Sequence, residues 1–348
     1  MLHSRSAPSK PLQVCLICNG AHAWLCAAAY EAQVQHTNPL CLVACNIQQR
    51  RQTTTNKRVS LCHILLLSLR CAHSRLKALC PTNTAFGMDL LALLADSHRD
   101  LRTAFGVAIP CLVSVLCHPP SLSQRRVLAA LVSLAANHPD NKRRMVDANL
   151  VPMAIMLLQS CWDGVRGQAA ALLLQLACDS AAFKERIVDA GAVPFLLSTL
   201  DAAHPCSDTT RTNAAAVLRS LALSEHARRV IAANGLQLLA GGVESGCCEC
   251  QALVADVVGM VAGHAWSVMG AAGLQVVVQP LAALLQSPSG ACRRAAAVAL
   301  RSVASCGGDA RLAVAGAAGA VVARQLRVVG PHDVEELHVL KQLAAILN

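Results

Sequence analysis

The sequence predicts an all-α protein whose helical units stack into a right-handed superhelical solenoid. A dipeptide, most often an aliphatic residue followed by proline, recurs at steps of 42 or 43 residues. A Leu-rich helical pattern follows each copy, and an Ala- and Leu-rich helix follows that. A period near forty residues is typical of stacked helical repeats. The dipeptides are Ile109-Pro110, Val151-Pro152, Val193-Pro194, Leu236-Gln237, Gln279-Pro280 and Val321-Val322.

Each unit is expected to contain up to three helices. A short polar helix comes first, as in residues 141–148, and the dipeptide then begins the second helix, where proline is tolerated because the first turn has no use for its N–H. The third helix is apolar around most of its circumference, as at Leu172, Leu173, Leu176 and Ala177, so neighbouring units must cover it. Glycines precede several dipeptides, and we expect a tight corner at Gly191, Gly235, Gly273 and Gly319.

The unit at residues 183–222 carries Ala190-Gly191-Ala192-Val193-Pro194. This segment resembles the corner of the armadillo repeat, and although HEAT repeats have a similar period, the Gly-x-Val-Pro corner favours armadillo. The resemblance implies about six armadillo-like repeats, and we place the armadillo repeat domain at residues 86–348, with residues 87–95 as a partial front unit. The six units are expected at residues 98–136, 141–178, 182–223, 225–263, 265–305 and 309–347.

The positive charge is concentrated outside the repeats. The formal net charge is +10, but residues 1–85 hold nine Lys or Arg and a single acid, Glu31, whereas the remainder holds 21 basic and 19 acidic residues. A nearly balanced array with 2% aromatic residues has neither a basic field nor stacking platforms for nucleic acid. We expect that no apolar run approaches the roughly 18 to 20 residues needed to cross a membrane, since the longest candidate, residues 64–69, is far too short. We therefore expect neither a nucleic-acid partner nor a membrane partner.

Residues 1–85 lack the repeat and hold eight of the 18 cysteines. We expect a Cys-rich, basic and poorly ordered extension; an organelle transit segment, a small metal module and a mis-assigned start of the reading frame are the alternatives. Cys15, Cys18, His22 and Cys26 are of the types that bind zinc, but two of their gaps are each one residue shorter than in the zinc knuckle they resemble. We therefore assign no metal or cofactor. The many cysteines without a secretory signal favour a reducing compartment, and we expect a cytoplasmic protein.

Three further cysteines crowd the start of a helix, in Cys247-Cys248-Glu249-Cys250. The helix dipole at such a position lowers a thiol pKa, which would suit a redox-sensitive or metal-binding spot. Adjacent cysteines on one helix point away from each other, however, so we favour an incidental cluster. Two acids, Glu335 and Glu336, open the last helix and are expected to stabilise its dipole.

The armadillo resemblance implies a concave groove lined by the third helices, where the family holds the backbone of an extended peptide with an Asn on each unit. The equivalent positions here are Ser133, Gln175, Ser220, Met260, Ser302 and Gln342, and five of these six side chains can form hydrogen bonds. The positions at which some members carry Trp are Ala129, Ala171, Ala216, Asp256, Val298 and His338, which disfavours binding of basic nuclear localisation peptides.

Basic residues gather near these positions in the C-terminal half. Arg219, Arg301 and Lys341 each precede an Asn-equivalent position, and Arg211, Arg293 and Arg294 lie near the starts of third helices. They predict a basic track that prefers an acidic partner segment, with a solvated helix edge as the alternative.

We found no phosphate-binding loop, zinc-protease motif, nucleophile elbow or dinucleotide fingerprint. We therefore expect a non-enzymatic, monomeric interaction scaffold or adaptor that binds a partner segment in the groove. The alternatives are an Hsp70-type chaperone cofactor with the same fold and an N-terminal zinc-binding module.

Overall fold

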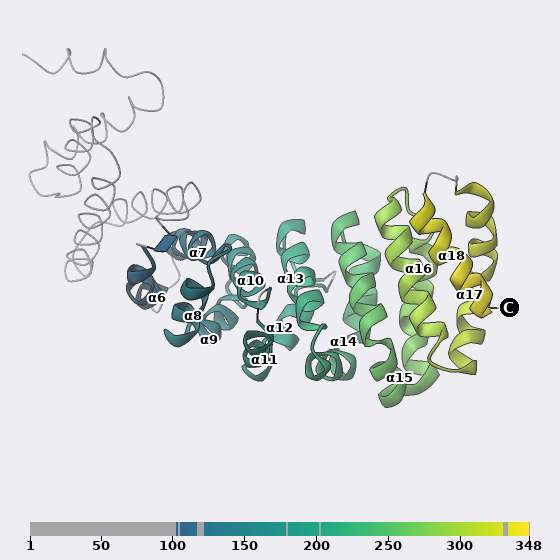
Figure 1. The fold of residues 1–348 in the computed structure, drawn as a ribbon, viewed down its shortest axis with the longest axis horizontal. Coiled ribbons are helices and arrows are strands. Elements are labelled where there is room, and N and C mark those ends of the chain that lie inside the picture. Colours follow the sequence, from purple (N-terminus) through teal and green to yellow (C-terminus); the bar gives the residue numbers. More distant parts are fainter. Residues whose placement is uncertain are drawn as a thin grey trace, which may run out of the picture.

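The computed structural model describes residues 102–103, 105–116, 122–178, 180–201, 203–329 and 333–347. Every regular element in these ranges is a helix, and the helices follow one another along a single elongated array from α6 to α18 (Figure 1). The predicted all-α solenoid is confirmed. The extension at residues 1–85, its Cys15–Cys26 motif and the partial unit at residues 87–95 lie outside the described residues.

The elements map onto the predicted units in order. The first unit ends with the short helix η2 (Gly106–Ala108), α6 (Ile109–Leu116) and α7 (Leu122–Ala135). The second and third units each have three helices, which are α8 (Pro139–Asp147), α9 (Leu150–Leu157) and α10 (Asp163–Ala177), then α11 (Ala181–Asp189), α12 (Ala192–Ser198) and α13 (Asp208–Leu221). The remaining units are built from α14 (Glu225–Ser245), α15 (Cys248–Leu284), α16 (Gly290–Ala304), α17 (Gly308–Val328) and α18 (Val334–Leu347).

Serine N-caps fix where several helices begin. Ser180, Ser207, Ser224 and Ser289 each accept a hydrogen bond on Oγ from the backbone N–H three residues later, at the starts of α11, α13, α14 and α16. An N-cap of this kind contributes about 1 kcal/mol relative to alanine, because it satisfies a backbone donor that the helix cannot satisfy itself.

Within the described ranges, the predicted corner between first and second helices forms only in the second and third units. Asn149 and Gly191 have left-handed φ values of 61° and 80°, and α9 and α12 begin directly after them. In the fourth and sixth units the predicted corner is wrong, because α14 and α17 run without a break through Gly235 and Gly319. Neither of these two units has proline at the start of its second helix, so nothing removes the backbone donor that a continuous helix needs.

The fifth unit turns at a different glycine from the one expected. Helix α15 continues through Gly273, and the backbone breaks instead at Gly270, which has φ 64° and ψ −159°. This conformation is accessible essentially to glycine alone, because a Cβ would clash with the backbone. The helical segment after Gly270 carries Pro280 in its interior rather than at its start. Helix α15 therefore joins the third helix of the fourth unit to the second helix of the fifth.

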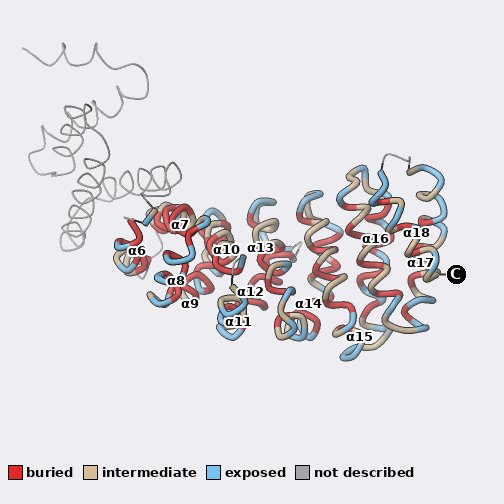
Figure 2. Tube along the Cα trace, in the orientation of Figure 1, coloured by how far each residue is buried: buried red, intermediate tan, exposed pale blue. Residues whose placement is uncertain are grey.

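The third helices form a continuous row. Contacts run from α7 to α10, α10 to α13, α13 to α15, α15 to α16 and α16 to α18. One aliphatic position two residues before the Asn-equivalent site is at most 1% exposed in all six units, and buried segments run through the middle of the array (Figure 2). Each such side chain contributes roughly 1.5 to 3 kcal/mol through removal of apolar surface from water. These residues are Leu131, Leu173, Leu218, Val258, Leu300 and Leu340.

One segment of the array is long and apolar enough to span a membrane by length and composition alone. Cys248–Gly270 has 23 residues and a mean hydropathy of 1.5, so the expectation that no run approaches this length is wrong. In the structure this segment is the third helix of the fourth unit. Helix α15 contacts α14 and α16, and Val254, Val257 and Val261 in this segment are fully buried. Packing within the solenoid buries 39% of the apolar window and so accounts for part of its apolar sequence.

Candidate partner-binding surface

The predicted groove positions recur on the exposed side of the stacked third helices. We define the third-helix face as the Asn-equivalent position and the residues one and four positions before it in each unit. Of the Asn-equivalent residues, Ser133 is 9% exposed and the other five are half-buried. The face therefore presents the same three positions in every unit. Its members are Ala129, Val132, Ser133, Ala171, Leu174, Gln175, Ala216, Arg219, Ser220, Asp256, Gly259, Met260, Val298, Arg301, Ser302, His338, Lys341 and Gln342.

Two of the predicted serines already donate hydrogen bonds inside the solenoid. Ser220 Oγ donates to the Ala177 carbonyl at 3.2 Å, which joins α13 to the end of α10. Ser302 Oγ donates to the Val298 carbonyl of its own helix at 3.1 Å. A hydroxyl that donates in this way keeps its lone pairs, so each serine can still accept a hydrogen bond from a peptide N–H.

The basic residues of the face link neighbouring third helices. Arg219 Nε on α13 donates to Asp256 Oδ2 on α15 at 2.8 Å, and both side chains remain partly exposed. Arg301 on α16 donates to Gln342 Oε1 on α18, and Gln342 Nε2 lies 2.8 Å from His338 Nε2. Because Asp256 balances Arg219, the excess positive charge of the face comes from Arg301 and the exposed Lys341.

Arg211 and Arg293, which the sequence placed in the basic track, hydrogen-bond to the backbone before their third helices. Both lie nine residues before an Asn-equivalent position, and the same position in three other units holds Gln124, Arg166 and Gln251. Each of these side chains donates to a backbone carbonyl in or just before the loop that leads into its third helix. The acceptors are the carbonyls of Leu116 for Gln124 (3.2 Å), Ser160 for Arg166 (3.0 Å), His204 for Arg211 (3.2 Å), Val243 for Gln251 (2.9 Å) and Ser287 for Arg293 (3.0 Å). The recurrence of Gln or Arg at one register was the signal in the sequence that could have revealed this position.

Arg293 also joins the last two third helices. Its Nε and Nη2 atoms lie 2.6 and 2.9 Å from the two carboxylate oxygens of Glu336 on α18. The hydrogen bond to Glu336 raises the pKa of Arg293. Glu336 is completely buried, so it acts as the partner of Arg293 in addition to lying in the first turn of α18. Arg294, which the sequence also placed in the basic track, has its Nε 3.9 Å from Oε2 of the exposed Glu335.

Of the three cysteines at the start of α15, Cys250 is fully buried. Burial raises the pKa of Cys250 to about 12, so the predicted lowering is wrong for this residue. Cys247 is half-buried, with its Sγ 3.4 Å from Thr212 Oγ1. Within the ranges that the structure describes, no group of three or more His, Cys, Asp or Glu side chains is arranged to hold a metal ion.

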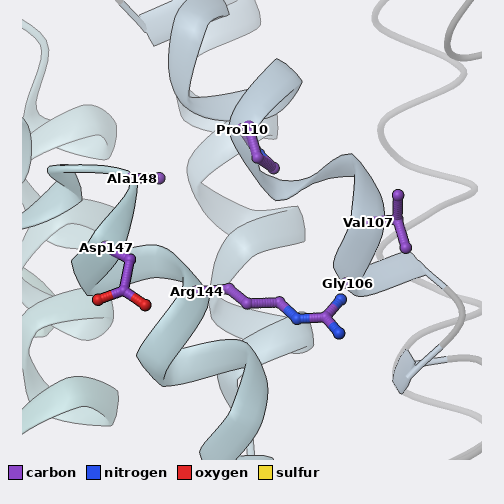
Figure 3. A pocket seen from close by; sticks show the side chains of 6 residues that line it. All are labelled: Gly106, Val107, Pro110, Arg144, Asp147 and Ala148. Atoms are coloured by element: carbon purple, nitrogen blue, oxygen red, sulfur yellow. The ribbon is translucent and has the colours of Figure 1, made fainter.

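An open hollow of about 530 Å³ lies between the first two described units, away from the third-helix face. It is formed by η2, α6 and α8, and Arg144 extends across it toward Gly106 while the Asp147 carboxylate lies on the other side (Figure 3). None of the predicted groove residues lines it. The lining residues are Gly106, Val107, Pro110, Arg144, Asp147 and Ala148.

Comparison with known proteins gives a fold and no family. No family model matches the sequence, and no curated protein matches it. Among solved structures, computationally designed armadillo repeat proteins for modular peptide recognition superpose with a TM-score of 0.61 at 18% identity, over 69% of this chain and 100% of theirs. A designed armadillo repeat protein in complex with the peptide (KR)4 gives 0.58 at 17% identity, over 69% of this chain and 99% of its own. An engineered protein gives 0.70 at 20% identity, over 96% of this chain and 87% of its own. The chain thus has an armadillo-like repeat fold.

Proposed function

We propose that this chain is a non-enzymatic scaffold that binds a segment of a partner protein along the third-helix face. The observation that carries the proposal is the unbroken row of third helices, each of which presents the same three positions. Two of the similar structures are described as peptide-recognition proteins or contain a bound peptide, which supports a protein or peptide partner in general.

The charge of the face favours an acidic partner segment. Asp256 is the one acid among the positions that define the face, and Arg219 already pairs with it. A basic peptide such as (KR)4 would therefore find no free carboxylate on this face. An acidic segment would instead meet Arg301 and Lys341, which lie near the C-terminal end of the array. We propose the cytoplasm as the compartment, since its reducing conditions suit a chain with 18 cysteines.

The proposal can be tested with a labelled oligo-glutamate peptide and a labelled Lys-Arg peptide, with fluorescence anisotropy as the measurement. We expect the wild-type protein to prefer oligo-glutamate. The double variant Arg301→Glu, Lys341→Glu should lose about tenfold in affinity for it, equivalent to about 1.4 kcal/mol. The matched control is Lys184→Glu, Arg186→Glu, which makes the same charge change on α11, a first helix outside the third-helix face.

Proximity labelling with the same variants tests the proposal in cells. We expect a defined set of proteins to be labelled by the wild type and by the control but not by the double variant Arg301→Glu, Lys341→Glu. Identical sets for all three forms, together with equal peptide affinities, would contradict a binding role for this face. A captured set that is dominated by Hsp70 and is sensitive to ATP would instead favour the chaperone-cofactor alternative.

A further inference from the structure

Two of the cysteines at the start of α15 lie on the same side of that helix. Cys247 is the N-cap residue, and Cys250 follows it by three positions. The Cys247 carbonyl accepts a hydrogen bond from the Gln251 N–H at 2.9 Å, so the helical bonding pattern already includes Cys247. Residues three apart on a helix are neighbours on its surface, whereas adjacent residues such as Cys247 and Cys248 do not face each other. The pair of interest is therefore Cys247 and Cys250.

Contacts with α13 confirm that both thiols face the same way. Cys247 Sγ lies 3.4 Å from Thr212 Oγ1 near the start of α13. Burial raises the pKa of Cys250 to about 12, and the nearby Cys247 thiol also raises it. The charges of Arg211 and Asp208, in the first turn of α13, act on Cys250 as well, which places it beside the same turn.

The sulfur of Cys250 points back toward the beginning of α15. A Cβ on Gly246, the residue before Cys247, would lie 3.1 Å from Cys250 Sγ. The missing Cβ of Gly246 thus leaves room beside the N-cap for this sulfur. Cα atoms three positions apart in an α-helix are about 5 Å from each other, within the range of roughly 4.4 to 6.8 Å that a disulfide spans. A disulfide between Cys247 and Cys250 therefore fits the backbone of α15 as it stands.

The two thiols differ in exposure and so differ in reactivity. Cys247 is half-buried, whereas Cys250 is 0% exposed, so a small molecule in solution reaches Cys247 first. The side chain of Cys247 makes no capping hydrogen bond, and the N–H groups of the first turn have no partners within the helix. These N–H groups stabilise negative charge on a sulfur at the N-cap while it attacks. Cys250 is then the thiol that reacts second.

We propose that Cys247 and Cys250 form a reversible disulfide, with a low-molecular-weight disulfide such as oxidised glutathione as the oxidant. The Cys247 thiolate attacks one sulfur of the small disulfide, which gives a mixed disulfide and releases one small thiol. Cys250 Sγ then attacks Cys247 Sγ, and its proton leaves with the second small thiol. In total the two protein thiols lose two electrons and two protons, and the small disulfide becomes two thiols. Neither cysteine belongs to the third-helix face, so this site is independent of the proposed partner binding.

The test uses the full reduced chain, incubated without air at increasing ratios of oxidised to reduced glutathione. After an acid quench and alkylation, a protease that cleaves after glutamate, including Glu249, places Cys247 and Cys250 on separate peptides. Mass spectrometry then detects their disulfide as a cross-link between the two peptides. We expect the cross-link to increase with the ratio and to disappear with dithiothreitol. The matched control is Cys248→Ser, which removes the exposed neighbouring thiol and should leave the cross-link unchanged.

Two further variants test the order of attack. In Cys250→Ala, glutathione should accumulate on Cys247, because the thiol that would displace it is gone. In Cys247→Ser, Cys250 should stay unmodified, because it is buried. Glutathione on Cys250 in Cys247→Ser would overturn this order.

The proposal itself is overturned by a wild-type chain that shows no cross-link at any ratio, or that carries glutathione on Cys248 alone. It is also overturned if Cys248→Ser loses the cross-link, or if Cys250 is linked to Cys206 instead. Cys206 is the other thiol whose charge acts on Cys250, and its Sγ donates to the Thr199 carbonyl at 3.3 Å. The wild-type and Cys248→Ser measurements decide the proposal even if Cys250→Ala does not fold.

Discussion

Removal of the buried carboxylate in Glu336→Gln should release the last helix from the array. Glu336 is 0% exposed, and it receives two hydrogen bonds from an Arg293 side chain that is 20% exposed. The amide is nearly isosteric with the carboxylate, so packing changes little. The substitution removes the negative charge and leaves the guanidinium of Arg293 largely buried without its counter-ion.

The expected cost follows from this geometry. Loss of one partner of a buried pair costs roughly 3 to 5 kcal/mol, because the remaining charge is uncompensated. Arg293 still donates to the carbonyls of Ser287 and Pro288, at 3.0 and 3.1 Å, and part of it reaches solvent, so the lower end applies. A loss of about 3 kcal/mol corresponds to roughly a 100-fold increase in the equilibrium constant for opening. The effect should be confined to the terminal unit, since each unit of a solenoid contacts only its neighbours.

Hydrogen exchange followed by mass spectrometry measures this opening directly. Amides of α18 should exchange about 100-fold faster in Glu336→Gln, whereas those of α10 should keep the wild-type rate. The control is Glu335→Gln, in which an 87% exposed carboxylate 3.9 Å from Arg294 is neutralised, with an expected cost below about 0.5 kcal/mol. Equal protection loss in the two variants, or none in Glu336→Gln, would refute the assignment of α16–α18 docking to this pair.

Three further outcomes can be measured on the same protein. Burial alone would raise the pKa of Asp163, but hydrogen bonds from Ser207, Thr210 and Arg166 outweigh it and hold that pKa below its usual 3.8. A lowered carboxyl pKa adds stability that is present above about pH 4 and is lost as the pH falls through the folded-state value, so acid denaturation should be less steep in Asp163→Asn; an unchanged pH slope would contradict this. Gly191→Ala should cost about 1 to 2 kcal/mol in thermal unfolding because φ is 80°, whereas Gly316→Ala, in a helix with open space around it, should stabilise by up to about 1 kcal/mol. Alkylation by iodoacetamide at pH 8, mapped by peptide mass spectrometry, should be far slower at Cys250, whose pKa burial raises to about 12, than at the exposed Cys248; comparable rates would show that the Cys250 thiol is accessible.

The sequence was sufficient to predict the architecture because the same helical pattern recurs in six units, so an ambiguous pattern in one unit does not obscure the others. The period of 42 or 43 residues and the buried leucines of the third helices predicted where each third helix lies, and the structure agrees from α7 to α18. The corners were less predictable. A glycine can adopt a left-handed conformation but does not have to. Gly191 is left-handed, whereas Gly235 lies inside a continuous helix. At Gly235 a Cβ would come within 2.8 Å of Leu197.

The details of the candidate face depend on contacts between units, which spacing along one helix does not reveal. Arg219 was expected to contribute free positive charge, but its partner Asp256 lies 37 residues away on the next third helix. In the same way, Arg211 was assigned to the basic track and Glu336 to the dipole of the last helix, and the structure shows that each bonds across a loop or a unit boundary. The choice of Ser133, Gln175, Ser220, Ser302 and Gln342 as peptide-contacting residues stays a prediction that the binding experiments address.

The fused helices give the array an uneven bending stiffness. Helices α14 and α17 each contain 21 residues in one unbroken stretch, which is about 30 Å of continuous helix at 1.5 Å per residue. The chain instead bends at Asn149 and Gly191 in the second and third units and at Gly270 in the fifth, single residues that can absorb a rotation. We therefore expect an applied torque to deform the array first at these three corners. A bound segment would then meet a surface that adapts near the corners and is stiff along α14 and α17.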